Sequence, residues 1–196
     1  MKQIVKDAII LTVITLISGC LLGLVYEITK EPIAVAQYNT QQKAYKTVFE
    51  TAETFEDLEN FEVTENGGTT VENAVVAKDT SGNALGYVIT VTSHEGYGGD
   101  ITFSVGITNE GVVNGYSITS ISETAGLGMK AKEEAFSSQF NEKSAASFEV
   151  VKGTATADNQ IEAISGATIT SSAVTNGVNA ALSYFGTITE GGSTNE

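Results

Sequence analysis

The feature that most constrains the fold of this chain is an uncharged stretch of nineteen residues, Ala8–Tyr26. With a rise of about 1.5 Å per residue, a helix over this stretch comes to just under the hydrocarbon thickness of a bilayer, about 30 Å. Asp7 and Glu27 bracket the stretch, and Tyr26 lies where interfacial aromatic side chains gather. Residues 1–30 therefore predict a single transmembrane helix with a short N-terminal flank.

A cleaved signal peptide is the alternative interpretation of the same stretch. Ile17-Ser18-Gly19-Cys20 resembles a lipoprotein processing site, at which Cys20 would be lipidated. The apolar region of a signal peptide usually covers only about 7–15 residues and ends at small residues. Here the apolar residues continue beyond Cys20 without a polar linker. We favour the uncleaved helix, and lipidation of Cys20 stays open.

The distribution of Lys residues predicts how this helix is oriented. Lys2 and Lys6 precede it, whereas only Lys30 lies in the fifteen residues that follow. Positively charged flanks tend to stay in the cytoplasm. We therefore expect a single-pass protein of the cytoplasmic membrane, in contact with the lipid bilayer, with a cytoplasmic N-terminus and an extracytoplasmic C-terminal domain.

Charge and composition exclude several classes of partner. The chain has 24 acidic and ten basic residues, a net charge of −14, and every basic residue is Lys. Because nucleic-acid binding needs clustered Lys or Arg, we expect no nucleic acid partner. One Cys, Cys20, and one His, His94, exclude a disulfide framework, an iron–sulfur cluster and a multi-His metal site. We assign no catalytic residue and no metal ligand.

Residues 31–60 are expected to form a juxtamembrane helix or stalk. Pro32 is the only proline, and it is predicted to interrupt the helix just outside the membrane. The helix is expected to resume over residues 33–49. The segment 51–59 is acidic and is predicted to be exposed.

Residues 61–186 are expected to form one domain. β-Branched residues punctuated by turn signals predict strands at 71–78, 85–93, 100–107, 112–121 and 148–151. Helices are predicted over residues 129–140 and 170–185, the second from a buried stripe that includes Val174, Val178 and Phe185. Runs of strands bounded by helices, without βαβ alternation, indicate an α+β fold with an antiparallel sheet. Residues 187–196 are expected to form a flexible tail.

Small and hydroxyl-bearing residues gather just before the last predicted helix, in Ile164-Ser165-Gly166-Ala167-Thr168-Ile169-Thr170-Ser171-Ser172. A helix N-terminus of this kind offers free N–H groups and a favourable dipole to a phosphate. The simpler interpretation is that Thr170 or Ser171 caps the helix while Gly166 and Ala167 form the turn. Composition alone favours the simpler interpretation.

Ser165-Gly166-Ala167-Thr168 resembles the SGAT flavinylation motif of two related families. These are the G subunit of the Rnf ion-translocating electron transport complex and the C subunit of the sodium-pumping NADH:quinone oxidoreductase. In both families FMN is joined through its phosphate, as an ester, to the last Thr of the motif. The resemblance therefore implies covalent FMN on Thr168.

Other segments extend this resemblance over nearly the whole chain. They are Glu27–Ile33, Gly96-Tyr97-Gly98-Gly99-Asp100-Ile101, Val105–Ile107, Gly111–Gly115 and Glu123-Thr124-Ala125-Gly126-Leu127-Gly128. The last is similar to the family's ETPGLG segment, with Ala125 in place of the usual Pro. Glu162 stands where the flavin transferase pattern usually has Asp, six residues before Thr168. The compact length favours the G subunit of Rnf over the longer C subunit of the quinone-reducing pump.

The resemblance implies a division of roles around the flavin. Thr168 supplies the ester oxygen, Ser165, Gly166 and Ala167 shape a slim loop that a flavin transferase can reach, and Thr170 and Ser171 are candidate phosphate donors. The second loop, against the isoalloxazine, would comprise Glu123, Thr124, Gly126, Leu127 and Gly128. An ordinary turn rich in glycine is the alternative for this loop. Tyr97 is a further candidate neighbour of the flavin, and His94 receives no role.

Three functions follow from these patterns. The first, implied by the resemblance, is a membrane-anchored electron-transfer subunit within the Rnf complex, which couples ferredoxin and NAD oxidoreduction to export of Na⁺ or H⁺. One membrane span, no nicotinamide fingerprint and no cluster cysteines make it one carrier among other subunits, without a complete catalytic activity alone. The alternatives are a cofactor-free, lipoprotein-like extracellular binding domain and a flavin-bearing sensor outside any complex. The order of the two loops favours the first.

Overall fold

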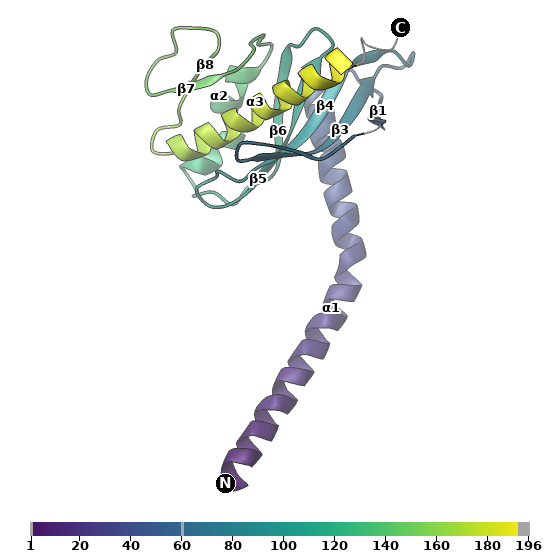
Figure 1. The fold of residues 1–196 in the computed structure, drawn as a ribbon, viewed down its shortest axis with the longest axis vertical. Helices are drawn as coiled ribbons and strands as arrows, with labels where there is room; N and C mark the ends of the chain where they lie inside the picture. The colour runs from purple at the N-terminus through teal and green to yellow at the C-terminus, as the bar shows by residue number, and fades with distance from the viewer. Residues whose placement is uncertain (1, 60, 192–196) are drawn as a thin grey trace. The chain divides into compact units, whose positions relative to one another are not determined.

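The computed structural model describes residues 2–59 and 61–191. The chain divides into two units, Met1–Thr40 and Gln41–Glu196. Helix α1 (Lys2–Val48) makes up the described part of the first unit, and its last residues, from Gln41, belong to the second (Figure 1). Within the described residues, α1 is the one helix that is long and apolar enough to cross a membrane, and it lies near the N-terminus.

Helix α1 continues through Pro32, so the predicted interruption at this residue is wrong. Proline lacks the N–H that would bond to the carbonyl four residues earlier. In a helix of 47 residues this removes one hydrogen bond, while the turns on both sides keep their own. Pro32 therefore weakens the helix locally without ending it.

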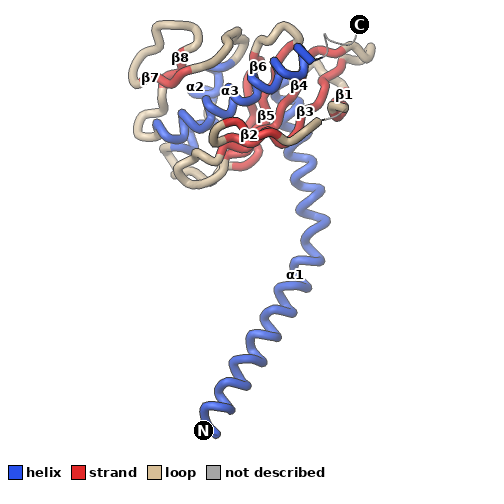
Figure 2. The backbone as a smooth tube through the Cα atoms, viewed as in Figure 1, coloured by secondary structure: helices blue, strands red, loops and turns tan. Residues whose placement is uncertain are grey.

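The second unit is built on an antiparallel sheet of six strands. The strands pair in the order β1-β3-β4-β5-β6, and the short β2 also pairs with β3 (Figure 2). Their bounds are β1 Thr54–Asp57, β2 Thr64–Asn66, β3 Thr69–Lys78, β4 Ala84–Ser93, β5 Ile101–Thr108 and β6 Val113–Ser120. In this register Val91 of β4 pairs with Val71 of β3 and with Phe103 of β5, so the side chains of these three residues lie on the same face of the sheet.

Helix α3 (Thr168–Gly191) covers one face of this sheet (Figure 1). It buries Val174, Val178 and Phe185 against the inward side chains of β3, β4 and β5, which confirms the predicted stripe. The opposite face receives the end of α1, where Tyr45, Val48 and Phe49 pack on Val75 and Val88. Both faces of the sheet carry buried apolar side chains, and over part of its area each face is covered by a helix. This arrangement confirms the predicted α+β class.

The predicted helix over residues 129–140 is wrong, because three short helical turns replace it. They are η1 (Gly128–Lys132), α2 (Glu134–Ser137) and η2 (Ser138–Phe140). The break is at Glu133, whose backbone is extended, with φ −80° and ψ 144°. Ala131, Phe136 and Phe140 are all buried, yet a spacing of five and then four residues cannot face one side of a regular helix. The extended residue turns all three side chains into the core.

Other departures concern short elements and helix ends. Strands β1, β2 and β8 (Gln160–Glu162) were not predicted, and β8 pairs with β7 (Glu149–Val151) in a separate parallel pair (Figure 1). Helix α3 begins at Thr168, two residues earlier than predicted, and continues to Gly191. The first residues of the predicted tail are therefore helical, and residues 192–196 lie outside the described residues.

Candidate functional site

The site begins with a tight turn immediately before helix α3. The Ala167 amide donates to the Ile164 carbonyl at 2.9 Å, which closes a turn with Ser165 and Gly166 at its centre. Gly166 has φ +76°, the value that the third residue of a type II turn needs and that residues with a β-carbon rarely adopt. The turn delivers Thr168 as the first residue of α3, where its side chain is half-buried.

A second turn of the same kind lies in the segment after β6. The Leu127 amide donates to the Thr124 carbonyl at 3.1 Å, and Gly126, again in third position, also has φ +76°. Ala125 therefore occupies the second position, where type II turns favour Pro. The Leu127 side chain reaches the first turn, with Cδ2 3.1 Å from the point where a β-carbon on Gly166 would lie.

The two turns contribute neighbouring parts of the wall of one cavity, of about 580 Å³. This volume lies in the range of sites that hold small organic cofactors, about 300–1,000 Å³. The lining residues are Tyr97, Glu123, Thr124, Leu127, Gly128, Gly166, Ala167, Thr168, Ile169 and Thr170. The structure thus brings together two segments that lie about forty residues apart in the sequence.

Most of the residues predicted for the site line this cavity, and three do not: Ser165, Gly126 and Ser171. Ser165 and Gly126 lie in the two turns and shape them. The Ser171 side chain is fully buried, accepts a hydrogen bond from the Ile164 amide at 3.0 Å and donates to the Ala167 carbonyl at 2.9 Å. Its hydroxyl fastens the first turn to the helix, so of the two candidate phosphate donors only Thr170, which is also buried, lines the cavity.

An apolar rim distinguishes this cavity from the rest of the domain. Tyr97 is 72% exposed, Ile169 54% and Leu127 41%, and all three line the cavity. From Gln41 onward, the described residues include one other exposed large hydrophobic residue, Val63. Exposed apolar side chains that gather around a hollow indicate a binding site. Ile169 was not predicted as a site residue. The feature that could have identified it is that it is apolar but lies outside the buried stripe of α3.

Glu123 is the charged residue inside the cavity wall. It is 8% exposed, and its Oε1 accepts a hydrogen bond from the Gly98 amide at 3.1 Å. No described Lys or His lies within ion-pair distance of this carboxylate. The hydrogen bond links the segment after β6 to the turn that carries Tyr97.

Tyr116 holds η1, the helical turn that follows this segment, from the core side. Its hydroxyl donates to the Ala131 carbonyl in η1 at 2.6 Å. The ring packs edge-on against Phe103 and Phe140, within the core cluster that also contains Ala131. Burial raises the pKa of Tyr116 well above its ordinary value of 10.0 and keeps the hydroxyl protonated as a donor.

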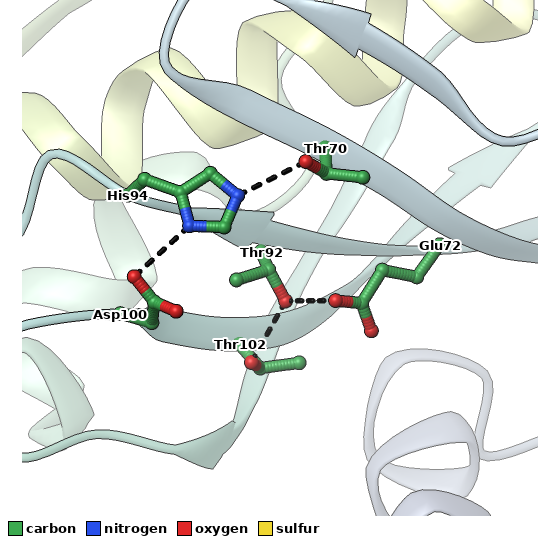
Figure 3. A network of polar contacts seen from close by, with 6 residues as sticks. All are labelled: Thr70, Glu72, Thr92, His94, Asp100 and Thr102. Atoms are coloured by element: carbon green, nitrogen blue, oxygen red, sulfur yellow. Dashed lines mark hydrogen bonds and ion pairs between the residues drawn. The ribbon is translucent and has the colours of Figure 1, made fainter.

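His94 takes part in a polar network at the ends of three strands and does not line the cavity (Figure 3). Its Nδ1 lies 2.9 Å from Asp100 Oδ1 and its Nε2 lies 3.0 Å from Thr70 Oγ1. Beside it, Thr92 Oγ1 donates to Glu72 Oε1 at 2.6 Å and lies 2.8 Å from Thr102 Oγ1. These contacts connect β3, β4 and the start of β5. The role of His94 in this structure is therefore to stabilise the ends of these strands.

Glu162 lies at the end of β8, and its side chain is exposed. Its Oε1 accepts a hydrogen bond from the Ala155 amide at 2.9 Å, and its own amide donates to Gln139 Oε1 at 2.7 Å. The residue therefore anchors the loop between β7 and β8. Its carboxylate remains at the protein surface.

Comparison with known proteins relates both parts of the chain to one family. Residues 96–183 match the FMN-binding domain, and residues 1–48 match the RnfG N-terminal region. The G subunit of the proton-translocating ferredoxin:NAD(+) oxidoreductase complex of Clostridium ljungdahlii is 35% identical over 181 residues, which covers 92% of this chain and 91% of the relative. The G subunit of the Na(+)-translocating ferredoxin:NAD(+) oxidoreductase complex of Acetobacterium woodii is 35% identical over 193 residues, covering 94% and 92%.

Among solved structures, the crystal structure of Shewanella oneidensis NqrC is similar to this chain with a TM-score of 0.48 and 18% identity. The match covers 67% of this chain and 65% of NqrC. The sequence relationships extend over more than nine-tenths of each of the two relatives from C. ljungdahlii and A. woodii. This chain therefore belongs to the RnfG family, the G subunits of Rnf complexes, with the FMN-binding domain at residues 96–183.

Proposed function

We propose that this chain is the subunit that carries FMN, covalently attached to Thr168, in a membrane complex that couples ferredoxin:NAD⁺ oxidoreduction to translocation of Na⁺ or H⁺. Its partners are the other subunits of that complex. When bound, FMN supplies one- and two-electron redox chemistry, and the protein supplies attachment, orientation and local polarity. The chain is one carrier in a series and has no complete catalytic activity alone.

The position of Thr168 is the observation that carries this proposal. Thr168 lines the cavity as the first residue of α3, a helix of 24 residues. No described residue makes a hydrogen bond with its hydroxyl, in contrast to Ser171 on the same turn. The unpaired amides and the dipole of a helix N-terminus favour a phosphate at this end. A phosphoester on Thr168 therefore places its charge where the backbone is suited to hold it.

The rest of the cavity fits the apolar, planar ring system of a flavin. Tyr97, Leu127 and Ile169 offer apolar and aromatic contact, while the backbone of the two turns offers polar groups. Aromatic and apolar walls with a few convergent polar groups are typical of cofactor sites. The Thr170 hydroxyl is the candidate side-chain donor to the phosphate, and Glu123, Thr124 and Gly128 line the same cavity.

The proposed topology follows from α1 and its flanks. Residues 8–26 span the cytoplasmic membrane, the N-terminus is cytoplasmic, and the FMN-bearing domain is extracytoplasmic. A flavin that dissociated outside the cell would be lost, so a covalent tether suits this location. Attachment then requires a flavin transferase that reaches the exposed turn at Ser165 and Gly166.

The test is mass spectrometry of the full chain expressed together with an active flavin transferase. Lys152 is the last Lys, so trypsin leaves residues 153–196 as one peptide, and fragmentation locates the modified residue. We expect a gain of about 438 Da, FMN minus water, on Thr168. Thr168→Ala should abolish it, and Thr154→Ala, which removes an exposed hydroxyl from the same peptide, should retain it.

An unmodified Thr168 in the presence of a transferase that modifies a known substrate would contradict covalent attachment in this chain. Glu162→Asp then distinguishes two causes. If it restores modification, the longer side chain at this position limits recognition by the transferase. If it does not, the cofactor-free binding domain becomes the better interpretation.

A further inference from the structure

The carboxylate of Glu123 lies where two segments of the cavity wall meet, and its surroundings leave it little freedom. A β-carbon on Gly128 would lie 2.6 Å from Glu123 Oε2 and 2.6 Å from Thr170 Oγ1. Glycine at position 128 therefore makes room for the carboxylate and for Thr170, in addition to any close approach of a cofactor. The side chain is clamped between its own loop and the first turn of α3.

The other oxygen of Glu123 is committed to the turn at residues 96–99. Oε1 accepts the hydrogen bond from the Gly98 amide, the residue directly after Tyr97. A buried carboxylate without a cationic partner is costly unless backbone donors compensate it. The hydrogen bond from the Gly98 amide provides this compensation, and it fixes the backbone that carries Tyr97.

We infer that Glu123 is a positioning residue, which holds the turn at residues 96–99 so that the ring of Tyr97 lies against the isoalloxazine of FMN. This inference rests on the proposed function of the cavity. Tyr97 is the one aromatic residue lining the cavity in the described part of the chain, and its ring is largely exposed. An aromatic ring stacks favourably on another π-system, but only when the backbone presents it at the right place.

Fluorescence of the attached flavin tests this inference, because a phenol ring in contact with a flavin quenches its emission. In the full flavinylated chain, Tyr97→Ala should raise the emission severalfold, and Glu123→Ala should raise it by a similar factor. The double variant should emit like Tyr97→Ala alone, because Glu123 acts through Tyr97. Unchanged emission in either single variant, or a further rise in the double variant, overturns the inference.

Two conservative variants separate the reach of the side chain from its charge. Glu123→Gln keeps an acceptor oxygen at the same distance and should restore quenching close to that of the wild type. Glu123→Asp keeps the charge but withdraws the oxygen by one methylene, so its emission should rise as in Glu123→Ala. The opposite pattern would show that the charge matters and not the hydrogen bond to Gly98. This pair carries the test if Glu123→Ala does not fold.

The hydrogen bond itself is tested without flavin, in a Thr168→Ala background. Amide exchange of Gly98 should accelerate about tenfold in Glu123→Ala and Glu123→Asp, and should stay close to the parent rate in Glu123→Gln. Equal exchange rates in all variants would overturn the inference on structural grounds. Peptide mapping of the wild type and of each variant distinguishes the two proposals. If the wild type carries no FMN on Thr168, the proposed function is contradicted. The exchange rate of the Gly98 amide then still decides whether Glu123 holds this backbone.

Discussion

Leu127 Cδ2 lies 3.1 Å from the position that a β-carbon on Gly166 would take, so the two turns of the cavity touch at this point. Each turn places a glycine with φ +76° in its third position, and each is closed by one backbone hydrogen bond. The difference between them is their surroundings. A β-carbon on Gly126 would meet no atom within 4 Å, whereas one on Gly166 would meet Leu127.

This difference predicts distinct effects of Gly166→Ala and Gly126→Ala. Both replace a glycine at positive φ, so each should lower the free energy of unfolding by about 1–2 kcal/mol, measured by chemical denaturation. Gly166→Ala should in addition push the Leu127 side chain slightly from its place in the cavity wall, and the yield of flavinylated protein should fall in this variant alone. Equal flavin yields in the two variants would show that the contact between Leu127 and Gly166 has no influence on the site.

Ala125→Pro should stabilise the protein. Ala125 is in the second position of the turn, where Pro has a suitable φ, and no described residue accepts a hydrogen bond from its amide. Because Pro restricts the unfolded chain, we expect a gain of about 0.4–1 kcal/mol in the free energy of unfolding. Ser165→Pro, at the equivalent position of the first turn, provides a comparison within the same chain. A lower thermal midpoint for Ala125→Pro would contradict the assignment of this turn.

Two glycines of α3 should respond to alanine in opposite directions. A β-carbon on Gly177 would overlap Phe103 Cζ in β5, whereas one on Gly186 would meet no atom within 4 Å. We expect Gly177→Ala to cost about 1–3 kcal/mol by overpacking and Gly186→Ala to stabilise by up to about 1 kcal/mol. Denaturant midpoints of the two variants check this. Phe103→Leu combined with Gly177→Ala should recover part of the loss.

Tyr116→Phe should weaken the protein near neutral pH and change its response to alkali. It leaves the Ala131 carbonyl without its hydroxyl donor, which should cost about 1–2 kcal/mol. In the wild type, burial raises the pKa of Tyr116, so above about pH 10 the unfolded chain releases a proton that the folded chain retains. Stability therefore falls as the pH rises past 10, by about 1.4 kcal/mol per pH unit for this group. The variant should lose this component, as denaturation at pH 8 to 11 would show.

Accessibility of introduced cysteines tests the proposed topology. In a Cys20→Ser background, Asp158→Cys should react with a membrane-impermeant maleimide on intact spheroplasts, because this side chain is fully exposed on the domain. Lys2→Cys should react only after the membrane is permeabilised. Reaction of both residues from outside would reverse the orientation. A mature chain that begins at residue 20 with a lipid would favour the lipoprotein alternative.

Much of the architecture follows from local sequence pattern. The length of the apolar stretch 8–26 predicted a helix, β-branched runs between turn signals predicted β3 to β6, and the stripe of Val174, Val178 and Phe185 predicted α3, so the class and approximate position of these elements were predictable. Periodicity could not reveal β1, β2 and β8, because three or four mostly exposed residues form strands only when a neighbouring strand offers its hydrogen bonds. Nor could it reveal the break at Glu133, which only the burial of Phe136 and Phe140 requires.

For the site, the sequence by itself predicted the two segments that line the cavity, since the SGAT and ETAGLG motifs are local patterns with recognisable residues. Only the tertiary structure decided which of those residues line the cavity and which hold the backbone in place. It commits the Ser171 hydroxyl to the backbone, leaves Thr168 and Thr170 lining the cavity, and adds Ile169 to the rim. It also joins Glu123 to Gly98, two residues 25 positions apart. Contacts of this kind depend on how strands and helices pack, and no spacing along the chain records them.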